Sequence, residues 1–187
     1  MTTAIYIDSN VWNWLFESNI DLWEEFPADS YEVCITNEII LEVDSIPEDK
    51  NLLREFAERT IKNAGAVNRP YFGFCNPDYQ LGQQRAGGFG SGVLAKADEV
   101  AFKHMRSHPA GAARPTGLEK HEADDALCMR SLHNVVLTLN MKNPFKAAYE
   151  KGGNVVFLNG FESCNISLRE FVEAHLKSRP QIGMPPT

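Results

Sequence analysis

Several acidic side chains in this 187-residue sequence occupy positions where a folded chain could use them for chemistry. Asp8 ends an apolar run and begins an amphipathic segment, which is the pattern of a strand that leads into a helix. Glu42 lies in a helical pattern after the second expected strand. Asp124 and Asp125 lie in a helical pattern that precedes a third expected strand. Because ligands bind at the carboxyl ends of strands in open α/β sheets, we expect these acids to converge.

Converging carboxylates repel one another unless a cation neutralises them. Oxygen ligands suit Mg²⁺ or Mn²⁺, which can polarise a phosphoryl oxygen and activate a bound water for phosphodiester hydrolysis. We predict Asp8, Glu42 and Asp125 as metal ligands and catalytic residues. Asp125 heads an apolar helical stripe, whereas Asp124 is rotated by about 100° and is expected to face solvent or to support the ligands.

Each of these acids, taken singly, also has an ordinary structural explanation. Asp8 fits a helix cap, and the other acids fit solvated positions on helices. Glu38 lies nearer the start of the Glu42 helix and competes with Glu42 for the same role, or else favours the helix dipole. Their joint placement is what favours a metal site.

The segments that must position these acids alternate between strand and helix patterns. Such alternation predicts a parallel sheet covered on both faces, so we expect a three-layer α/β/α sandwich in a single domain, 1–187. Trp12 and Trp14 are expected in its core. The expected strands cover about 4–7, 31–36, 135–139 and 154–158, and the expected helices cover about 9–26, 37–43, 45–63, 93–108, 116–133, 144–151 and 167–177.

A Gly-rich and aromatic excursion interrupts this pattern at about 67–115. It contains the aromatic run Tyr71–Phe74 and the stretch Gly82–Gly92, with five glycines in eleven residues. Neither the GxxxxGK[ST] nor the GxGxxG spacing occurs there, so phosphate binding is only weakly indicated. The glycines favour a mobile insertion, which is long enough to act as a lid, over a second domain.

Composition limits the partners and the compartment. A net charge of −7 argues against a general nucleic-acid binder, but it leaves room for an enzyme with a local basic rim around an acidic site. The four cysteines form no CxxC pair, so they suggest neither a zinc site nor a disulfide framework. The sequence has no leader pattern and no apolar run of membrane length, so we expect a cytoplasmic protein.

Four motifs follow one another in a recognisable order. They are the strand into Asp8, Thr36 followed six residues later by Glu42, the sequence DAL at Asp125, and VVLTLN followed by Phe145. In this order they resemble a PIN-domain ribonuclease, the family that includes the VapC-type toxins. The resemblance covers the chain apart from the excursion. It implies an endoribonuclease in which carboxylates hold Mg²⁺ or Mn²⁺ and a water attacks the RNA phosphate.

The chain departs from the family pattern at the last acidic position, which is Asn140 here. The resemblance therefore implies a reduced site with Asn140 as a neutral ligand, and a catalytically weakened, PIN-like binding module is an alternative. It also implies an RNA substrate, an antitoxin-like protein partner and a homodimer. The candidates to support the ligands are Asn10, Thr138, Asp124 and Asn143, and the candidate RNA contacts, which also fit ordinary surface charge, are Arg85, Lys103 and Arg106.

A second enzyme family offers a rival interpretation. The stretch around Asp8 is similar to the DxDxV motif of haloacid-dehalogenase-like phosphatases, in which the first Asp is a nucleophile. Here Asn10 replaces the second Asp, and the pair Asp124 and Asp125 precedes the apolar face of a helix instead of following a strand. We therefore rank the phosphatase second.

Overall fold

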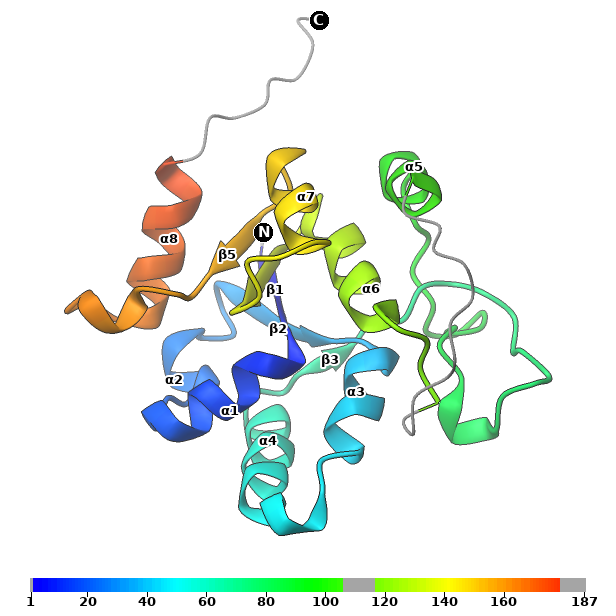
Figure 1. The fold of residues 1–187 in the computed structure, drawn as a ribbon, viewed down its shortest axis with the longest axis horizontal. Helices are drawn as coiled ribbons and strands as arrows, with labels where there is room; N and C mark the ends of the chain where they lie inside the picture. Colours follow the sequence, from blue (N-terminus) through cyan, green and yellow to red (C-terminus); the bar gives the residue numbers. More distant parts are fainter. Residues whose placement is uncertain (1, 106–116, 179–187) are drawn as a thin grey trace, which may run out of the picture.

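The computed structural model describes residues 2–105 and 117–178, and it contains one central sheet of five parallel strands (Figure 1). The strand order is β3-β2-β1-β4-β5, and the four neighbouring pairs are all parallel. The predicted α/β fold with a central parallel sheet is therefore confirmed. The strands are β1 (Thr3–Ile7), β2 (Tyr31–Ile35), β3 (Val67–Asn68), β4 (Val135–Thr138) and β5 (Val155–Phe157).

The central strand β1 shows why these segments form strands. Ile5 pairs with Val33 of β2 on one side and with Val135 of β4 on the other. All three side chains are buried, because helices cover both faces of the sheet. A parallel strand covered on both faces needs a continuous apolar run, and this is the pattern that ends at Asp8.

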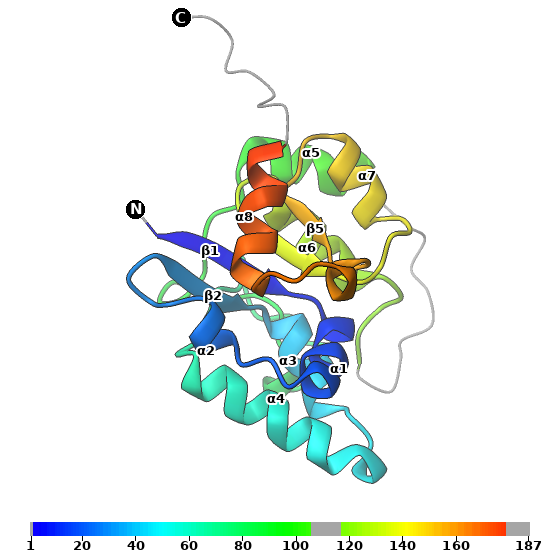
Figure 2. The same ribbon diagram turned by 90° about the vertical axis from the view of Figure 1, so that its left-hand side faces the viewer.

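Helices lie on both sides of the sheet, with α1–α4 on one side and α6 and α7 on the other (Figures 1 and 2). Trp12 and Trp14 of α1 are buried, as predicted. Within the described ranges, no helix is both long and apolar enough to cross a membrane. The helices are α1 (Ser9–Ser18), α2 (Leu22–Glu25), α3 (Asn37–Asp44), α4 (Asn51–Asn63), α5 (Ala97–Met105), α6 (Glu122–Ser131), α7 (Phe145–Glu150) and α8 (Leu168–Ser178), with 3-10 turns at Glu48–Lys50, Leu81–Gln83 and Phe161–Ser163.

Several elements differ from the predictions. The helix expected at 9–26 is divided into α1 and α2, and the helix expected from residue 45 begins as α4 at Asn51. The short edge strand β3 was not expected, because its two residues have no apolar pattern of their own. The helix predicted from about residue 93 begins at Ala97, since Val93 forms a β-bridge with Tyr71. The helix predicted from about residue 116 begins at Glu122, because His121 has a left-handed backbone with φ 70°. The C-terminal ends of the predicted helix 93–108 and of the excursion lie outside the described residues.

Candidate functional site

Asp8 lies directly after β1, at the carboxyl edge of the sheet, and only 1% of it is exposed. Its backbone N–H donates to the carbonyl of Leu137, so the pairing of β1 with β4 extends to this residue. Asp8 occupies the N-cap position of α1, yet its side chain makes no capping hydrogen bond. The backbone N–H of Ser9, at the start of α1, nevertheless stabilises its charge, and the carboxylate also has partners outside this helix.

Two side chains hold the Asp8 carboxylate in place. The hydroxyl of Thr138, at the end of β4, donates to Oδ2 of Asp8 at 2.6 Å, and Nδ2 of Asn10 donates to the same oxygen at 2.5 Å. The amide oxygen of Asn10 also accepts from the backbone N–H of Leu139 at 3.0 Å. Asn10 and Thr138 thus join the ends of β1 and β4 around one carboxylate, as expected of residues that support a ligand.

The electrostatic surroundings of Asp8 are unfavourable for its charge. Burial raises its pKa to about 7, and the negative charges of Asp124 and Glu42 contribute to the rise, while the hydrogen bond from Thr138 opposes it. Asp8, Asp124 and Glu42 therefore share one acidic environment at the end of β1. The charges of Glu42, a predicted ligand, and of Asp124 in α6 both act on Asp8, and metal ligation by these residues stays a prediction.

The two aspartates of α6 are adjacent in the sequence. The charge of Asp124 acts on Asp8, and Asp125 lines a cavity beside α6. Seven of the ten residues of α6 are buried, so apolar side chains do not mark a single inward face, and the role of Asp125 as a ligand stays a prediction. We expect Asp124→Asn to lower the pKa of Asp8, because it removes a neighbouring negative charge.

The comparison of Asp124→Asn with Asp125→Asn tests this assignment. Titration of Asp8 by carbon-detected NMR should show the lowered pKa in the first variant and little change in the second. Equal effects of the two variants, or a larger effect of Asp125→Asn, would show that the assignment is wrong.

The predicted neutral ligand Asn140 has a local role in the structure. Its backbone N–H donates to the hydroxyl of Thr138 at 2.9 Å, and its side-chain oxygen accepts from the backbone N–H of Lys142 at 3.0 Å. That oxygen therefore stabilises the turn after β4. Asn143, a further candidate to support the ligands, is exposed and precedes Pro144.

The donor set of this acidic site fits a hydrated magnesium or manganese ion. Among residues 2–105 and 117–178, no three Asp, Glu, His or Cys side chains lie close enough to form a closed metal-binding group. Mg²⁺ does not require one, because it is held by one or two carboxylates and keeps several waters. Asp8, with Asp124 or Glu42, supplies oxygen donors of that kind.

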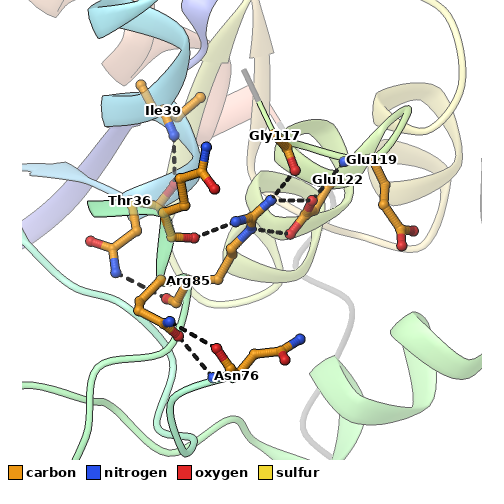
Figure 3. A network of polar contacts seen from close by, with 10 residues as sticks. Thr36, Ile39, Asn76, Arg85, Gly117, Glu119 and Glu122 are labelled. Atoms are coloured by element: carbon orange, nitrogen blue, oxygen red, sulfur yellow. Dashed lines mark hydrogen bonds and ion pairs between the residues drawn. The ribbon is translucent and has the colours of Figure 1, made fainter. Parts of the chain in front are cut away.

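Arg85, a predicted RNA contact, is committed to contacts within the protein (Figure 3). Its guanidinium pairs with Glu122 of α6 at 2.9 Å and also donates to the carbonyls of Gln83 and Gly117. Its guanidinium carbon lies 3.9 Å from the ring centroid of Tyr79. Only 11% of its side chain is exposed, so Arg85 fastens the excursion to α6. The sequence held no signal for its pairing with Glu122, which is 37 positions away.

The other predicted RNA contacts are placed differently. Lys103 is exposed on α5 and lines the cavity beside α6, while Arg106 lies outside the described residues. The cavity has a volume of about 690 Å³ and separates the excursion from α6. Glu38, at the start of α3, also lines it, and burial raises the pKa of that carboxyl. Glu38 therefore belongs to the cavity, whereas Glu42 belongs to the acidic site.

Comparison of the chain with protein-family models, with curated proteins and with solved structures finds no match.

Proposed function

We propose that this protein is a Mg²⁺- or Mn²⁺-dependent endoribonuclease that hydrolyses phosphodiester bonds of RNA. The observation that carries the proposal is Asp8, a buried carboxylate at the carboxyl end of the central strand whose pKa is raised to about 7. Part of that shift comes from the neighbouring carboxylates Asp124 and Glu42. A divalent cation would relieve this repulsion, and the order of the sequence motifs supports RNA as the substrate.

Each residue of the acidic site has a defined task under this proposal. Asp8, with Asp124 or Glu42, would hold the cation, which supplies charge stabilisation at the phosphate and a more acidic bound water. Thr138 and Asn10 orient the carboxylate of Asp8 through their hydrogen bonds to Oδ2. Preorganisation of this kind matters because a misplaced ligand weakens both metal binding and catalysis.

The experiment combines metal binding with RNA cleavage. We expect calorimetry with Mn²⁺ to detect binding, and we expect a fluorescent RNA to be cut when Mn²⁺ or Mg²⁺ is present and EDTA is absent. Asp8→Asn should remove cleavage and weaken metal binding by more than the roughly 10- to 100-fold that loss of a residue supporting a ligand causes. Asp29→Asn, a change of the same chemistry at an exposed position, is the matched control.

The same experiment separates the alternatives. Metal binding and RNA binding without cleavage would favour a PIN-like binding module over a nuclease. A covalent aspartyl adduct at Asp8 after treatment with a phosphate analogue would favour the phosphatase, which the burial of Asp8 disfavours. The antitoxin-like partner and the homodimer rest on the PIN-domain resemblance and stay predictions.

A further inference from the structure

Three phenylalanine side chains of the excursion form a cluster at the protein surface, which we call the Phe cluster: Phe72, Phe74 and Phe89. Their ring centroids lie 5.1 to 6.0 Å apart in edge-to-face arrangements. Phe74 is 77% exposed and Phe89 is 87% exposed. Large aromatic side chains are normally buried, so a cluster that leaves two rings this exposed calls for a functional explanation.

The backbone around the Phe cluster is built to display it. Strand-like bonds join its two sides, since the N–H of Phe72 donates to the carbonyl of Val93 at 2.7 Å and the N–H of Val93 donates to the carbonyl of Pro70 at 2.9 Å. A Cβ atom at Gly92 would lie 2.6 Å from Cα of Phe72, and one at Gly87 would lie 2.4 Å from Cγ of Pro70. These glycines therefore permit a close crossing of the chain that brings Phe89 to Phe72.

The Phe cluster continues into the cavity beside α6. Phe72 belongs to both, and the cavity is also lined by the exposed cations Lys103 and Lys120. The cavity is also lined by Asp125 of α6, the residue that follows Asp124 in the sequence. One aromatic ring of the Phe cluster and two basic side chains thus line the same cavity.

Basic residues are unevenly distributed along the chain and are concentrated around the Phe cluster in the sequence. Residues 67–120 contain seven of the 18 Lys and Arg residues but only four of the 25 Asp and Glu residues. Residues 1–49 contain no Lys or Arg at all. Basic residues are therefore in excess in the excursion and the segment after it. Arg69 and Arg85 pair with Glu32 and Glu122, while Lys103 and Lys120 are exposed cations that would attract an anionic partner.

We propose that the Phe cluster is a stacking site for unpaired bases of a nucleic-acid strand, whose phosphates are contacted by Lys103 and Lys120. Stacking of bases on aromatic rings combined with basic side chains is the general mode by which proteins bind single strands. The inference rests on the proposed nuclease function, because that function provides the strand, and it adds a base-binding site outside the acidic site.

A protein partner fits the Phe cluster less well. Two phenylalanine side chains offer at most about 500 Å² together. A stable protein interface buries about 800 Å² on each partner. The residues that flank the rings include Gly73, Gly88, Gly90 and Ser91, which add little apolar area. A flat base needs only the face of a ring, so the small apolar surface suits it.

The test measures binding of fluorescent oligo(U) and oligo(dT) to the full chain in EDTA, where cleavage is suppressed. Phe74→Leu/Phe89→Leu keeps apolar side chains but removes the rings, and it should weaken binding by about 10-fold or more. Phe74→Tyr/Phe89→Tyr keeps the rings and should bind like the wild type. Leu52→Ala changes an equally exposed apolar residue on α4 and should have no effect.

Two further readouts make the test specific. Phe89→Trp should give an emission that is quenched when the oligonucleotide binds. Lys103→Gln/Lys120→Gln should reduce the slope of log affinity against log salt concentration by about 1.4. Each phosphate of a single strand that a lysine neutralises contributes about 0.7 to this slope, and the double variant removes two such lysines. Lys177→Gln, at an exposed position of α8, should leave the slope unchanged.

Three results would overturn the stacking site: no binding of either oligonucleotide, equal binding by the Leu and Tyr variants, or a self-association of the wild type that the Leu variant abolishes. The last would make the Phe cluster an interface between copies of the chain. Ring-dependent binding without cleavage in Mn²⁺ would refute the nuclease and retain the stacking site. RNA cleavage in Mn²⁺ together with oligonucleotide binding that does not depend on the rings would refute the stacking site and retain the nuclease.

Discussion

Replacing Asp8 with Asn raises the free energy of unfolding above pH 7, although it removes the central residue of the proposed active site. Burial and the charges of Asp124 and Glu42 raise the pKa of Asp8 from 3.8 to about 7. The folded protein therefore resists ionisation of Asp8, whereas the unfolded chain does not. The amide removes that conflict, and its oxygen can still accept the hydrogen bonds that Thr138 and Asn10 donate to Oδ2.

The direction of this stability change and the pH range over which it develops follow from the linkage between proton binding and folding. Below about pH 4 the carboxyl is protonated in both states, so the wild type carries no penalty there. Between about pH 4 and pH 7 the unfolded chain releases the proton while the folded protein keeps it, and wild-type stability falls as pH rises. The full penalty is reached above about pH 7 and amounts to at most about 4 kcal/mol, at 1.36 kcal/mol for each pKa unit.

Urea unfolding in EDTA at about pH 4 and about pH 8 measures this difference. The gain from Asp8→Asn should be large at the higher pH and should nearly vanish at the lower one. Asp29→Asn, at an exposed position, should show no such pH dependence. A variant that is less stable than the wild type at the higher pH would show that Asp8 is not under electrostatic stress.

Replacing Arg85 with Ala should release the excursion from α6. The substitution removes the ion pair with Glu122, the hydrogen bonds to the carbonyls of Gln83 and Gly117, and the packing against Tyr79. Glu122 would then be left without its charge partner. Losing the hydrogen bonds of a partly buried charged group costs about 2 kcal/mol, and we expect the cost to fall on the excursion while the sheet remains intact.

Hydrogen exchange followed by mass spectrometry can locate the effect. The amides of Phe72, Gly87 and Val93, which are hydrogen-bonded within the excursion, should exchange faster in Arg85→Ala, while those of β1 and β4 should not change. Arg54→Ala is the control, because its pair with Glu58 is 3.9 Å long and partly exposed, and such pairs contribute at most about 1 kcal/mol. Unchanged protection of the excursion would contradict the fastening role of Arg85.

Much of the fold and part of the acidic site were predictable from local patterns. The apolar run before Asp8 predicted both β1 and the placement of its carboxylate, because a strand that is buried on both faces must be continuously apolar. Thr36, a residue type favoured at helix N-caps, caps α3, and its hydroxyl accepts from the N–H of Ile39. These features depend on residues that are neighbours in the sequence, so the sequence reveals them directly.

The features that local patterns missed depend on contacts between distant segments. The charge of Asp124 acts on Asp8, and an apolar stripe could not show this, because seven of the ten residues of α6 are buried and its neighbours lie on several sides. Arg85 fastens the excursion to α6. Gly87 and Gly92 allow two segments of the excursion to cross closely, and the requirement for glycine there is visible only in the folded chain. Aromatic residues of the excursion form the Phe cluster for the same reason. Composition marks this segment as unusual, but only long-range packing shows which of its side chains hold it in place and which it presents to a partner.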